Sequence, residues 1–388
     1  MNEMIKREGM IVLGSTGSVG TQALDVAERT GTPIEAICAN RDVDTVETQA
    51  RKFGVRMCAM ADEKAAADLK LKLSDTSVRV LSGDDGIAEM IAASNAPIVL
   101  NAIIGEAGLC STLAVLRSNK QLALANKESL VVAGEIVMRE ARERGITIRP
   151  VDSEHCAIAQ ALRAGEHGEV KRLILTASGG PFFGKKREEL TCVRASDALA
   201  HPTWSMGAKI TIDSATMMNK GFEIIEAAYL FDVPADRINV VVHRESIIHS
   251  MVEYIDHSII AQMSVPDMRH CIQHALTDPC RESAVIAPLD LVSVGKLTFA
   301  APDEQTFPLL RMARRAISAG GATAAVLNAA NEVAVDAFLH DRIGFCALSD
   351  IVCEVVEQLS EAKEAHTLEK ILYYDRLARE TASSYIKQ

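Results

Sequence analysis

Short apolar runs alternate with amphipathic stretches through residues 1–151. Met10–Leu13, Ile34–Ala39 and 98–103 are largely apolar and have the length of buried strands. Between such runs, 21–30 and 109–118 repeat their apolar positions at helical spacing. Further strands are predicted at 78–81, 121–125 and 146–151, and further helices at 86–93 and 129–144. This alternation predicts a parallel, Rossmann-like α/β domain.

The pattern changes in the middle of the chain, where predicted strands follow one another more closely. They lie at 172–177, Ile238–Val242, 247–254 and 258–263. We interpret the last three as a meander, one face of which could pair with a second subunit, in an α+β domain. Residues 281–308 hold several prolines and little periodicity, which favours a linker. Helical spacing then returns at Leu309–Ala319, 324–339, 349–362 and 368–383, and it predicts a C-terminal helical bundle.

Within this middle region, the stretch 209–223 is predicted to lead from a strand into a helix. The alternation in 209–212 predicts a short strand, and Asp213 and Ser214 can cap a following helix. Gly221 interrupts that helix before a second helical run at 222–231. The segment therefore predicts a strand, a helix start and a break at the glycine.

Three polar side chains of this stretch could face one spot. Asn219 and Glu223 are four apart and Lys220 and Glu223 three apart, so a helix brings them together near Ser214. An amide, a cation, a carboxylate and a hydroxyl suit a phosphorylated or polyhydroxylated ligand. A capped surface helix with an ion pair explains the segment alone equally well.

Length and composition restrict the function further. A chain of 388 residues suggests two or three domains, and a net charge of −11 without a cluster of Lys and Arg disfavours nucleic-acid binding. The nine cysteines are scattered without a Cys-x-x-Cys pair, which indicates reduced thiols and no structural zinc. No apolar run has the length of a signal-peptide core or of a membrane span. We expect a cytoplasmic protein.

A glycine-rich loop follows the first predicted strand. Gly-Ser-Thr-Gly-Ser-Val-Gly at 14–20 separates that strand from a helix, as in a dinucleotide-binding turn. Glycines let the backbone approach a pyrophosphate at the helix N-terminus. The spacing Gly-x-x-Gly-x-x-Gly is not the commoner one, and a glycine-rich turn without a ligand is the alternative.

The residues after the second strand bear on the choice of cofactor. Asn40, Arg41 and Asp42 stand where a dinucleotide's adenosine ribose is usually met. An acid there favours NAD, whereas a guanidinium suits the 2′-phosphate of NADP. Because Arg41 comes first, we predict NADP.

Two further polar groups lie at predicted strand ends. Asn126, Lys127 and Glu128 follow the strand at 121–125, where ligands bind in open α/β sheets, although they would also suit a polar helix start. Asp152, Ser153, Glu154 and His155 follow the strand at 146–151. Two carboxylates two positions apart share a face if extended, and oxygen ligands indicate Mg²⁺ or Mn²⁺. An acidic helix start is the alternative.

Two loops in the middle region also have the composition of binding loops. Ser-Gly-Gly-Pro at 178–181 predicts a tight turn whose hydroxyl and N–H groups could hold an anion. The segment 201–207 contains Trp204, the only tryptophan of the chain, beside Pro, Ser and Gly. We interpret it as a loop that closes over a ligand, with a core tryptophan that anchors a loop as the alternative.

In their order along the chain these motifs resemble the 1-deoxy-D-xylulose 5-phosphate reductoisomerase family. The motifs that carry the resemblance lie at 14–20, 126–128, 152–155, 178–182, 201–207, 209–223, 248–252, 265–269 and 327–332. The resemblance covers nearly the whole chain. It implies a homodimer with an NADPH domain at 1–151, a catalytic domain with a mobile flap at 152–280, a linker at 281–308 and a helical domain at 309–388.

The resemblance also implies roles for individual residues. The divalent metal would be held by Asp152, Glu154 and Glu223. The substrate would be bound by Lys127, Ser153, Glu154, Ser178, His201, Trp204, Met206, Ser214, Asn219, Lys220 and Glu223, with Ser178, Ser214, Asn219 and Lys220 nearest its phosphate. NADPH would contact Thr16, Gly17, Ser18, Val19, Asn126, Glu128 and Gly207, and Lys127 would lie between cofactor and substrate.

The implied activity is the metal-dependent, NADPH-linked conversion of 1-deoxy-D-xylulose 5-phosphate to 2-C-methyl-D-erythritol 4-phosphate, in the non-mevalonate isoprenoid pathway. The residues predicted to catalyse this reaction are Lys127, Asp152, Glu154, Lys220 and Glu223. The sequence departs from the family's pattern at 40–42, where Gly-Lys/Arg-Asn is more usual, and at 243–246, where His-Arg-Glu-Ser replaces His-Pro-Gln-Ser.

Two other functions compete with this one. The first is a metal-free NADP-dependent dehydrogenase of another small phosphorylated or acidic substrate, for which Cys156 is the candidate nucleophile. The second is an NADP-sensing regulator with a helical interaction domain. The first rival predicts turnover without metal, and the second predicts cofactor binding without turnover.

Overall fold

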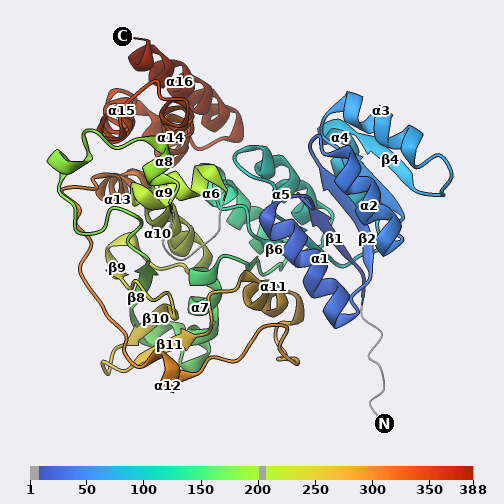
Figure 1. Cartoon of the computed structure of the whole chain (residues 1–388), viewed down its shortest axis with the longest axis horizontal. Helices are drawn as coiled ribbons and strands as arrows, with labels where there is room; N and C mark the ends of the chain where they lie inside the picture. Colours follow the sequence, from blue (N-terminus) through green and yellow to red (C-terminus); the bar gives the residue numbers. More distant parts are fainter. Residues whose placement is uncertain (1–7, 201–206, 388) are drawn as a thin grey trace. The chain divides into compact units, whose positions relative to one another are not determined.

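The computed structural model describes residues 8–200 and 207–387 of the chain, shown in Figure 1. It divides into two compact units. The first comprises Met1–Ser129, Val137–Cys156 and Asp267–Ala287, and the second comprises Leu130–Ile136, Ala157–Pro266 and Pro288–Gln388. Each unit therefore contains segments that are far apart in the sequence.

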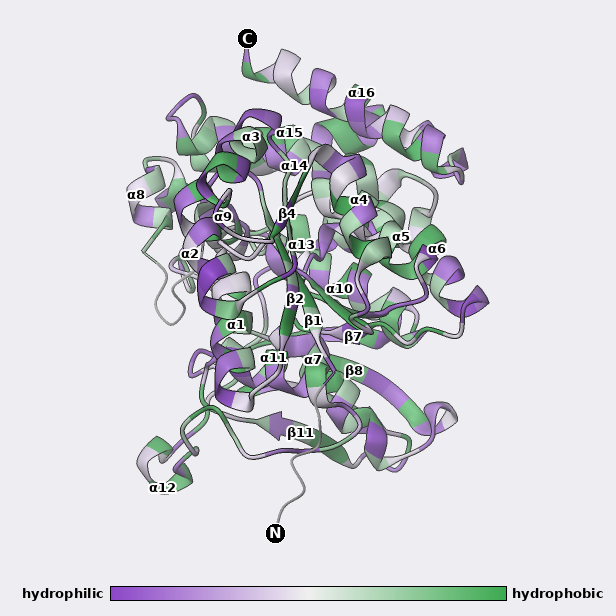
Figure 2. Ribbon diagram, turned by 90° about the vertical axis from the view of Figure 1, so that its right-hand side faces the viewer, coloured by the Kyte–Doolittle hydropathy of each residue, from purple (hydrophilic) through white to green (hydrophobic). Residues whose placement is uncertain are grey.

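The first unit is built on a seven-stranded parallel sheet. Its order is β4-β3-β2-β1-β5-β6-β7, so the strand order reverses direction beside β1. The strands are β1 Met10–Leu13, β2 Ile34–Ala39, β3 Met57–Met60, β4 Arg79–Ser82, β5 Ile98–Asn101, β6 Gln121–Leu124 and β7 Arg149–Pro150. In Figure 2, β1 and β2 are green along their length, as expected for strands covered on both faces. The predicted Rossmann-like sheet is confirmed.

Helices connect these strands in the right order for a doubly wound domain. They are α1 Ser18–Thr30, α2 Val43–Phe53, α3 Glu63–Lys72, α4 Gly83–Ala93, α5 Ala107–Arg117 and α6 Glu128–Glu143. Helix α7 Ser153–Ala161 follows the last strand, and α11 Met268–Thr277 comes from a later segment of the chain. The sequence did not predict α2, β3, α3 or α11. The strand predicted at 146–151 is shortened to the two residues of β7. One hydrophobic core joins β1, β2 and β3 to α1, α2 and α3 and includes Ile272 and Ala275 of α11.

The second unit contains a four-stranded mixed sheet in the order β11-β10-β8-β9. Its strands are β8 Val170–Ala177, β9 Ile238–Val242, β10 Ile248–Tyr254 and β11 Ile259–Met263. β10 pairs antiparallel with both β8 and β11, whereas β9 pairs parallel with β8. The predicted strands exist, but the meander is wrong because β9 pairs with β8 instead of β10.

Helices make up the rest of the second unit. The α-helices are α8 Ala195–Ala198, α9 Ala208–Ala215, α10 Met218–Phe231, α12 Leu291–Val294, α13 Leu309–Ala319, α14 Thr323–Leu339, α15 Phe345–Gln358 and α16 Leu368–Ile386. Short 3₁₀ turns lie at Leu162–Ala164, His167–Glu169, Arg187–Leu190, Ala235–Arg237 and Ser360–Glu364. The C-terminal bundle is confirmed: α14 packs against both α15 and α16 (Figure 1). α15 begins at Phe345 rather than at 349.

The strand predicted at 209–212 is wrong, because these residues lie in α9. Their alternation of Ile and polar residues is too short to fix the period. In the structure Ile212 and Ala215 are buried at helical spacing, and Lys209 forms an i,i+4 ion pair with Asp213 that a strand would not allow. Packing against α10 and α14 decides the conformation.

The predicted break at Gly221 is also wrong, since α10 runs through it. The break comes earlier, at Met217, whose φ of 64° places it in the left-handed region between α9 and α10. Gly221 instead allows a close helix contact: a Cβ there would lie 2.7 Å from Cβ of Ala313 on α13. The glycine therefore serves packing of α13 against α10.

The predicted linker has little regular structure. Within 281–308 the structure shows the single turn of α12 and an isolated bridge between Ala300 and Val242 of β9. His243 fixes this segment further, because its Nδ1 lies 2.9 Å from the carbonyl oxygen of Thr298. The domain boundaries proposed at 151, 280 and 308 stay a prediction.

Candidate active site

The glycine loop lies where the strand order of the first unit reverses. Gly14 follows β1 with φ 77°, and a Cβ at Gly20 would lie 2.1 Å from the carbonyl oxygen of Gly14. Side chains are thus excluded where the backbone turns into α1. Gly17 is the N-cap of α1 and makes no side-chain cap hydrogen bond, so the first N–H groups of the helix have no side-chain acceptor there. Such a terminus can bind an anion.

The residues after β2 separate into two roles. The Asp42 carboxylate accepts a hydrogen bond from the backbone N–H of Thr45 at 3.1 Å and caps α2. Arg41 is largely exposed, with 78% of its side-chain surface accessible, and pairs with Asp62 at 3.0 Å. Because Asp42 is used as a helix cap, Arg41 is the residue of this group available to a phosphate. Nothing in the sequence predicted that Asp62 would form an ion pair with Arg41.

Polar side chains meet at the carboxyl ends of β6 and β7. Asn126 and Lys127 follow β6, and Asp152 follows β7, which is its neighbour in the sheet. Nζ of Lys127 therefore lies 2.9 Å from Oδ2 of Asp152. Asn126 donates through Nδ2 to Oε2 of Glu128 at 3.1 Å. Adjacent parallel strands end at the same edge, so residues 25 apart in sequence form one cluster.

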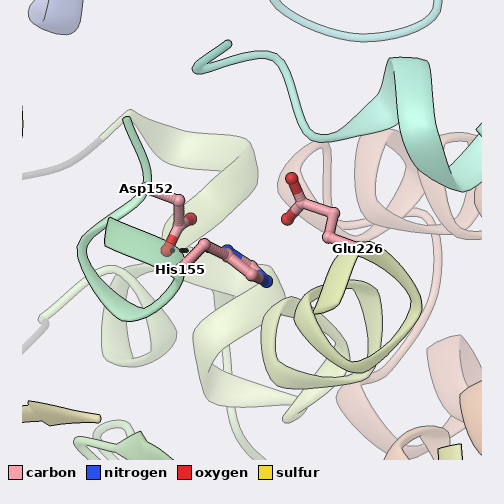
Figure 3. Close-up of side chains that lie close together, drawn as sticks. All are labelled: Asp152, His155 and Glu226. Carbon is pink, nitrogen blue, oxygen red and sulfur yellow. Dashed lines mark ion pairs between the residues drawn. The ribbon is translucent and has the colours of Figure 1, made fainter. Parts of the chain in front are cut away.

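Asp152 is the centre of this cluster. Burial by itself would raise the pKa of Asp152, but Lys127 and His155 outweigh it and hold the pKa of that carboxyl well below its usual range. Figure 3 shows the ion pair between Nδ1 of His155 and Oδ1 of Asp152, which are 3.5 Å apart, and also draws Glu226 of α10 in the other unit. Asp152 is therefore a partly buried carboxylate, with 15% of its side chain accessible, whose low pKa keeps it ionised.

Glu154 gives the cluster a second carboxylate. An oxygen of Glu154 lies within 4.8 Å of an oxygen of Asp152, and Oγ of Ser153 donates to Glu154 at 2.5 Å. The pair stands at the start of α7 and not on an extended strand, because the N–H of Cys156 bonds to the carbonyl of Asp152. Carboxylate oxygens at this spacing fit Mg²⁺ or Mn²⁺.

The second unit presents a compact polar group on α10. Lys220 forms an ion pair with Glu223, and Nδ2 of Asn219 donates to Oε1 of Glu223 at 2.5 Å. Lys220 and Glu223 are 4% and 1% exposed, so the alternative of a solvated surface helix is wrong. The expected meeting of these three side chains on one helix is confirmed.

The turn after β8 lies beside α9. Gly179 and Gly180 have φ values of 79° and 64°, and the N–H of Gly180 bonds to Oγ of Ser178 at 3.3 Å. A Cβ at Gly180 would lie 2.9 Å from the carbonyl oxygen of Ser214. The two glycines thus bring the segment of Ser178 against the segment of Ser214, which leads into α10.

Comparison with known proteins gives the family. Three family models match: 1-deoxy-D-xylulose 5-phosphate reductoisomerase over residues 10–134, its C-terminal domain over 148–231, and the DXP reductoisomerase C-terminal domain over 263–381. The 1-deoxy-D-xylulose 5-phosphate reductoisomerase of Acetivibrio thermocellus is 48% identical over 376 residues, which are 97% of this chain and 98% of that protein. The chain belongs to the 1-deoxy-D-xylulose 5-phosphate reductoisomerase family.

Solved structures of reductoisomerases are also similar to the structure of this chain. The enzyme from Zymomonas mobilis in complex with NADPH aligns with a TM-score of 0.92 at 42% identity, over 99% of this chain and 100% of that one. A DOX-P reductoisomerase in complex with NADPH, fosmidomycin and magnesium also gives 0.92, at 39% identity and 98% coverage of both chains. The predicted family and fold class are confirmed.

Part of the expected reductoisomerase site lies outside the described residues. His201, Trp204 and Met206 fall in 201–206, so the expected closing loop stays a prediction. Gly207, at the end of that loop, is the N-cap of α9 and is exposed.

The departure from the reductoisomerase pattern at 243–246 forms a defined turn. Nε2 of His243 accepts hydrogen bonds from the N–H groups of Ile247 and Ile248, both at 3.2 Å. The guanidinium of Arg244 lies 5.0 Å from the ring centroid of Phe183, and Glu245 accepts from Thr298 at 2.7 Å. These contacts involve none of the expected ligand residues.

The rival nucleophile Cys156 is 1% exposed and shares a hydrogen bond with the thiol of Cys271. That bond, together with burial, raises the pKa of Cys271 well above its usual range. A reactive cysteine is instead accessible and in an electropositive environment. The structure gives no support to a cysteine-dependent dehydrogenase.

Proposed function

We propose that the residues described above carry out the family's reaction in this chain. The chain is an NADPH-dependent oxidoreductase that converts 1-deoxy-D-xylulose 5-phosphate to 2-C-methyl-D-erythritol 4-phosphate in isoprenoid biosynthesis. The observation that carries the assignment is the ionised Asp152 with Glu154 at a carboxyl edge of a sheet whose strand order reverses at a glycine loop. This arrangement supports the proposal, because two of the three proposed metal ligands and the proposed dinucleotide turn follow strands of one parallel sheet.

NADPH is the cofactor, as in the solved relatives that are complexed with NADPH, and its pyrophosphate would lie on the N-terminus of α1. The residues proposed to contact it there are Thr16, Gly17, Ser18 and Val19. Arg41 would meet the 2′-phosphate, because Asp42 is occupied as the cap of α2. Asn40, Asn126, Glu128 and Gly207 complete the proposed contacts.

A divalent metal, Mg²⁺ or Mn²⁺, would be held by Asp152, Glu154 and Glu223. The oxygen donors fit such an ion, and Asp152 and Glu154 already lie within 4.8 Å of each other. When bound, the ion supplies Lewis-acid stabilisation of the negative charge that develops on substrate oxygens. The third carboxylate, Glu223, is buried on α10 in the other unit.

The substrate phosphate would be bound by Ser178, Ser214, Asn219 and Lys220. The net charge of −11 repels anions, so local groups must bind the phosphate. Lys220 is the buried cation among these four residues. Contacts to a phosphate remote from the reacting carbons supply binding energy that orients the substrate. Ser153, His201, Trp204 and Met206 are proposed to bind the rest of the substrate and to exclude water.

Lys127 is the proposed catalytic cation beside the metal ligands. Its ammonium lies 2.9 Å from Asp152, and its side chain is 9% exposed. A buried ammonium in this position stabilises developing negative charge on a substrate oxygen or delivers a proton to it.

The decisive experiment is an absorbance assay of NADPH oxidation on addition of 1-deoxy-D-xylulose 5-phosphate, with and without Mg²⁺ or Mn²⁺. We expect turnover with metal, and its loss after exhaustive chelation or in Glu223→Gln. Turnover that survives both treatments would favour the metal-free dehydrogenase. Tight binding of NADPH without any turnover would favour the NADP-sensing regulator.

A homodimer and a cytoplasmic location are part of the proposal. β11 is the edge strand of the second sheet and exposes Ile259 and Ile260, 51% and 38% accessible, which a second subunit could cover. All nine cysteines are free thiols, as in a reducing compartment. Light scattering after size exclusion tests the dimer, and Ile259→Lys should shift it toward monomer. No described helix is long and apolar enough to cross a membrane.

A further inference from the structure

A buried carboxylate connects α9 to the C-terminal helices. Asp213 is 2% exposed, and burying a charge is costly unless it is paired. Nδ2 of Asn331 on α14 donates to its Oδ1 at 2.7 Å, and Nζ of Lys209 lies 3.1 Å from its Oδ2. Each oxygen of Asp213 therefore has its own partner, one of them from a helix 118 residues away in sequence.

The same carboxylate is linked to α10. Nζ of Lys209 lies 5.1 Å from the ring centroid of Phe222, which is fully buried on α10 beside Glu223. The backbone oxygen of Asp213 accepts from Oγ1 of Thr216 at 3.2 Å, in the turn between α9 and α10. Asp213 thus contacts α14 and the α9–α10 turn directly, and it is connected to Phe222 of α10 through Lys209.

Stability alone is a poor explanation for Asn331. The residue is fully buried, and its Oδ1 has no hydrogen-bond partner in the part of the chain that the structure describes. A buried polar atom without a partner is destabilising, so this amide costs stability at its oxygen while its nitrogen satisfies the Asp213 carboxylate. What the amide provides is a directed bond that fixes how α9 is set against α14.

We propose that Asn331 and Asp213 are positioning residues through which the C-terminal helices set the affinity for the substrate phosphate. The inference rests on the proposed function of Ser214, Asn219 and Lys220. Ser214 directly follows Asp213, and α10 follows α9 after a two-residue turn. A small rotation of α9 would therefore move the hydroxyl of Ser214 and the start of α10 together. The glycine loop belongs to the other unit and has no part in this connection.

The chain offers a matched control in Asn328. It lies one turn before Asn331 on α14, is equally buried, and also has an Oδ1 with no partner among the described residues. Its Nδ2 bonds only within α14, to Glu332 at 3.3 Å. Asn328→Leu therefore reproduces the loss of a buried amide from the same helix without touching Asp213.

The test compares Asn331→Leu with Asn328→Leu in the NADPH-oxidation assay. For Asn331→Leu we expect KM for 1-deoxy-D-xylulose 5-phosphate to rise about tenfold, the size expected for a hydrogen bond to a charged group. KM for NADPH should stay within about twofold, and Asn328→Leu should change neither KM by more than that. Circular dichroism and thermal unfolding would establish that both variants are folded.

The inference is overturned if folded Asn331→Leu keeps the wild-type KM for the substrate. It is also overturned if Asn328→Leu raises that KM equally, or if KM for NADPH rises in parallel. If Asn331→Leu does not fold, the same KM comparison is made with Lys209→Met. The Lys209 side chain is 22% exposed, so replacing it leaves the core filled. An inactive wild-type protein would contradict the proposed function instead.

Discussion

The two candidate anion sites of this chain are built in different ways. In the glycine loop of the first unit, the backbone forms the site: Gly14 has φ 77°, and α1 begins without a side-chain cap. On α10 of the second unit, side chains form it, and Lys220 and Asn219 both contact the carboxylate of Glu223. We expect a site formed by the backbone to lose ligand binding when a substitution adds side-chain atoms. We expect a site formed by side chains to lose ligand binding when a substitution removes a charge.

The difference extends to what holds each site in place. The glycine loop is held by elements next to it in the first unit: Gly20 packs against Gly14, and the N–H groups of Gly14 and Ser15 donate to the carbonyl oxygen of Cys38 on β2. The α10 group depends on α13, which packs at Gly221, and on α14, which reaches Asp213. Distant parts of the second unit should therefore influence its site, whereas the glycine loop should respond mainly to changes in the loop and in the strands and helices that contact it.

Adding atoms to the loop should give the largest effect. A Cβ at Gly20 would lie 2.1 Å from the carbonyl oxygen of Gly14 and 2.7 Å from Cα of Ser15, so Gly20→Val must displace the backbone. We expect NADPH affinity to fall at least about a hundredfold, measured by fluorescence titration.

Gly17→Ala serves as the graded comparison for this variant. A Cβ at Gly17 would meet only the carbonyl oxygen of Gly14 at 3.4 Å, an ordinary contact, so its loss of affinity should be under about tenfold. If folded Gly20→Val binds NADPH as well as Gly17→Ala does, NADPH affinity does not depend on the steric room around the loop backbone.

Removing a charge from α10 should give the next effect. Lys220→Met keeps the approximate volume and removes the ammonium, so kcat/KM for the substrate should fall up to about a hundredfold. KM for NADPH should stay near the wild-type value. Lys171→Met removes another lysine of the second unit that is ion-paired, with Glu253 at 3.1 Å, and should leave kcat/KM unchanged. Equal losses in both variants would mean that Lys220 contributes only to folding.

A smaller effect is expected from Arg41, whose side chain is proposed to bind the same cofactor as the backbone of the glycine loop. Arg41 is 78% exposed, so Arg41→Ala should reduce the preference for NADPH over NADH by about tenfold. Catalytic efficiency with NADH should hardly change, because NADH lacks the 2′-phosphate. Equal efficiency with both cofactors already in the wild type would remove the role assigned to Arg41.

The two sites also differ in how far the sequence predicts them. The order β1, glycine loop, α1 follows from adjacent residues, and the structure has each part in place. Near α10 the local pattern gave a wrong prediction. The alternation of Ile with polar residues over four positions predicted a strand at 209–212, but packing against α10 and α14 makes these residues helical. Nothing local in the sequence indicates that Asn331 contacts Asp213, 118 residues earlier.

The carboxylates show the same limit. Asp152 and Glu154 are close in sequence, and their pairing could be proposed from spacing. The contact of Lys127 with Asp152 could not, since it requires that β6 and β7 be neighbours in the sheet. Patterns thus predict elements and motifs, while the partners of buried charges depend on the topology.

The smallest expected effect concerns an ion-paired carboxylate outside the proposed site. Hydrogen bonds from Lys171 and Arg172 lower the pKa of Glu253 on β10 to about 2. The pKa is lower in the folded state than in the unfolded one, where it is near the usual value of about 4.3. The stabilisation is therefore fully present above that unfolded value and is lost as pH falls through it toward 2.

Glu253→Gln should consequently lower Tm by a few degrees at pH 7, roughly the effect of one such interaction, and the difference from wild type should shrink below about pH 4. Glu354→Gln is the control, because Glu354 is exposed on α15 and has no ion pair among the described residues. A Tm difference for Glu253→Gln that stays constant between pH 7 and pH 3 would show that shape, not charge, accounts for it. Substrate KM should be the same in Glu253→Gln and the wild type, since the ion pairs of Glu253 with Lys171 and Arg172 join β10 to β8.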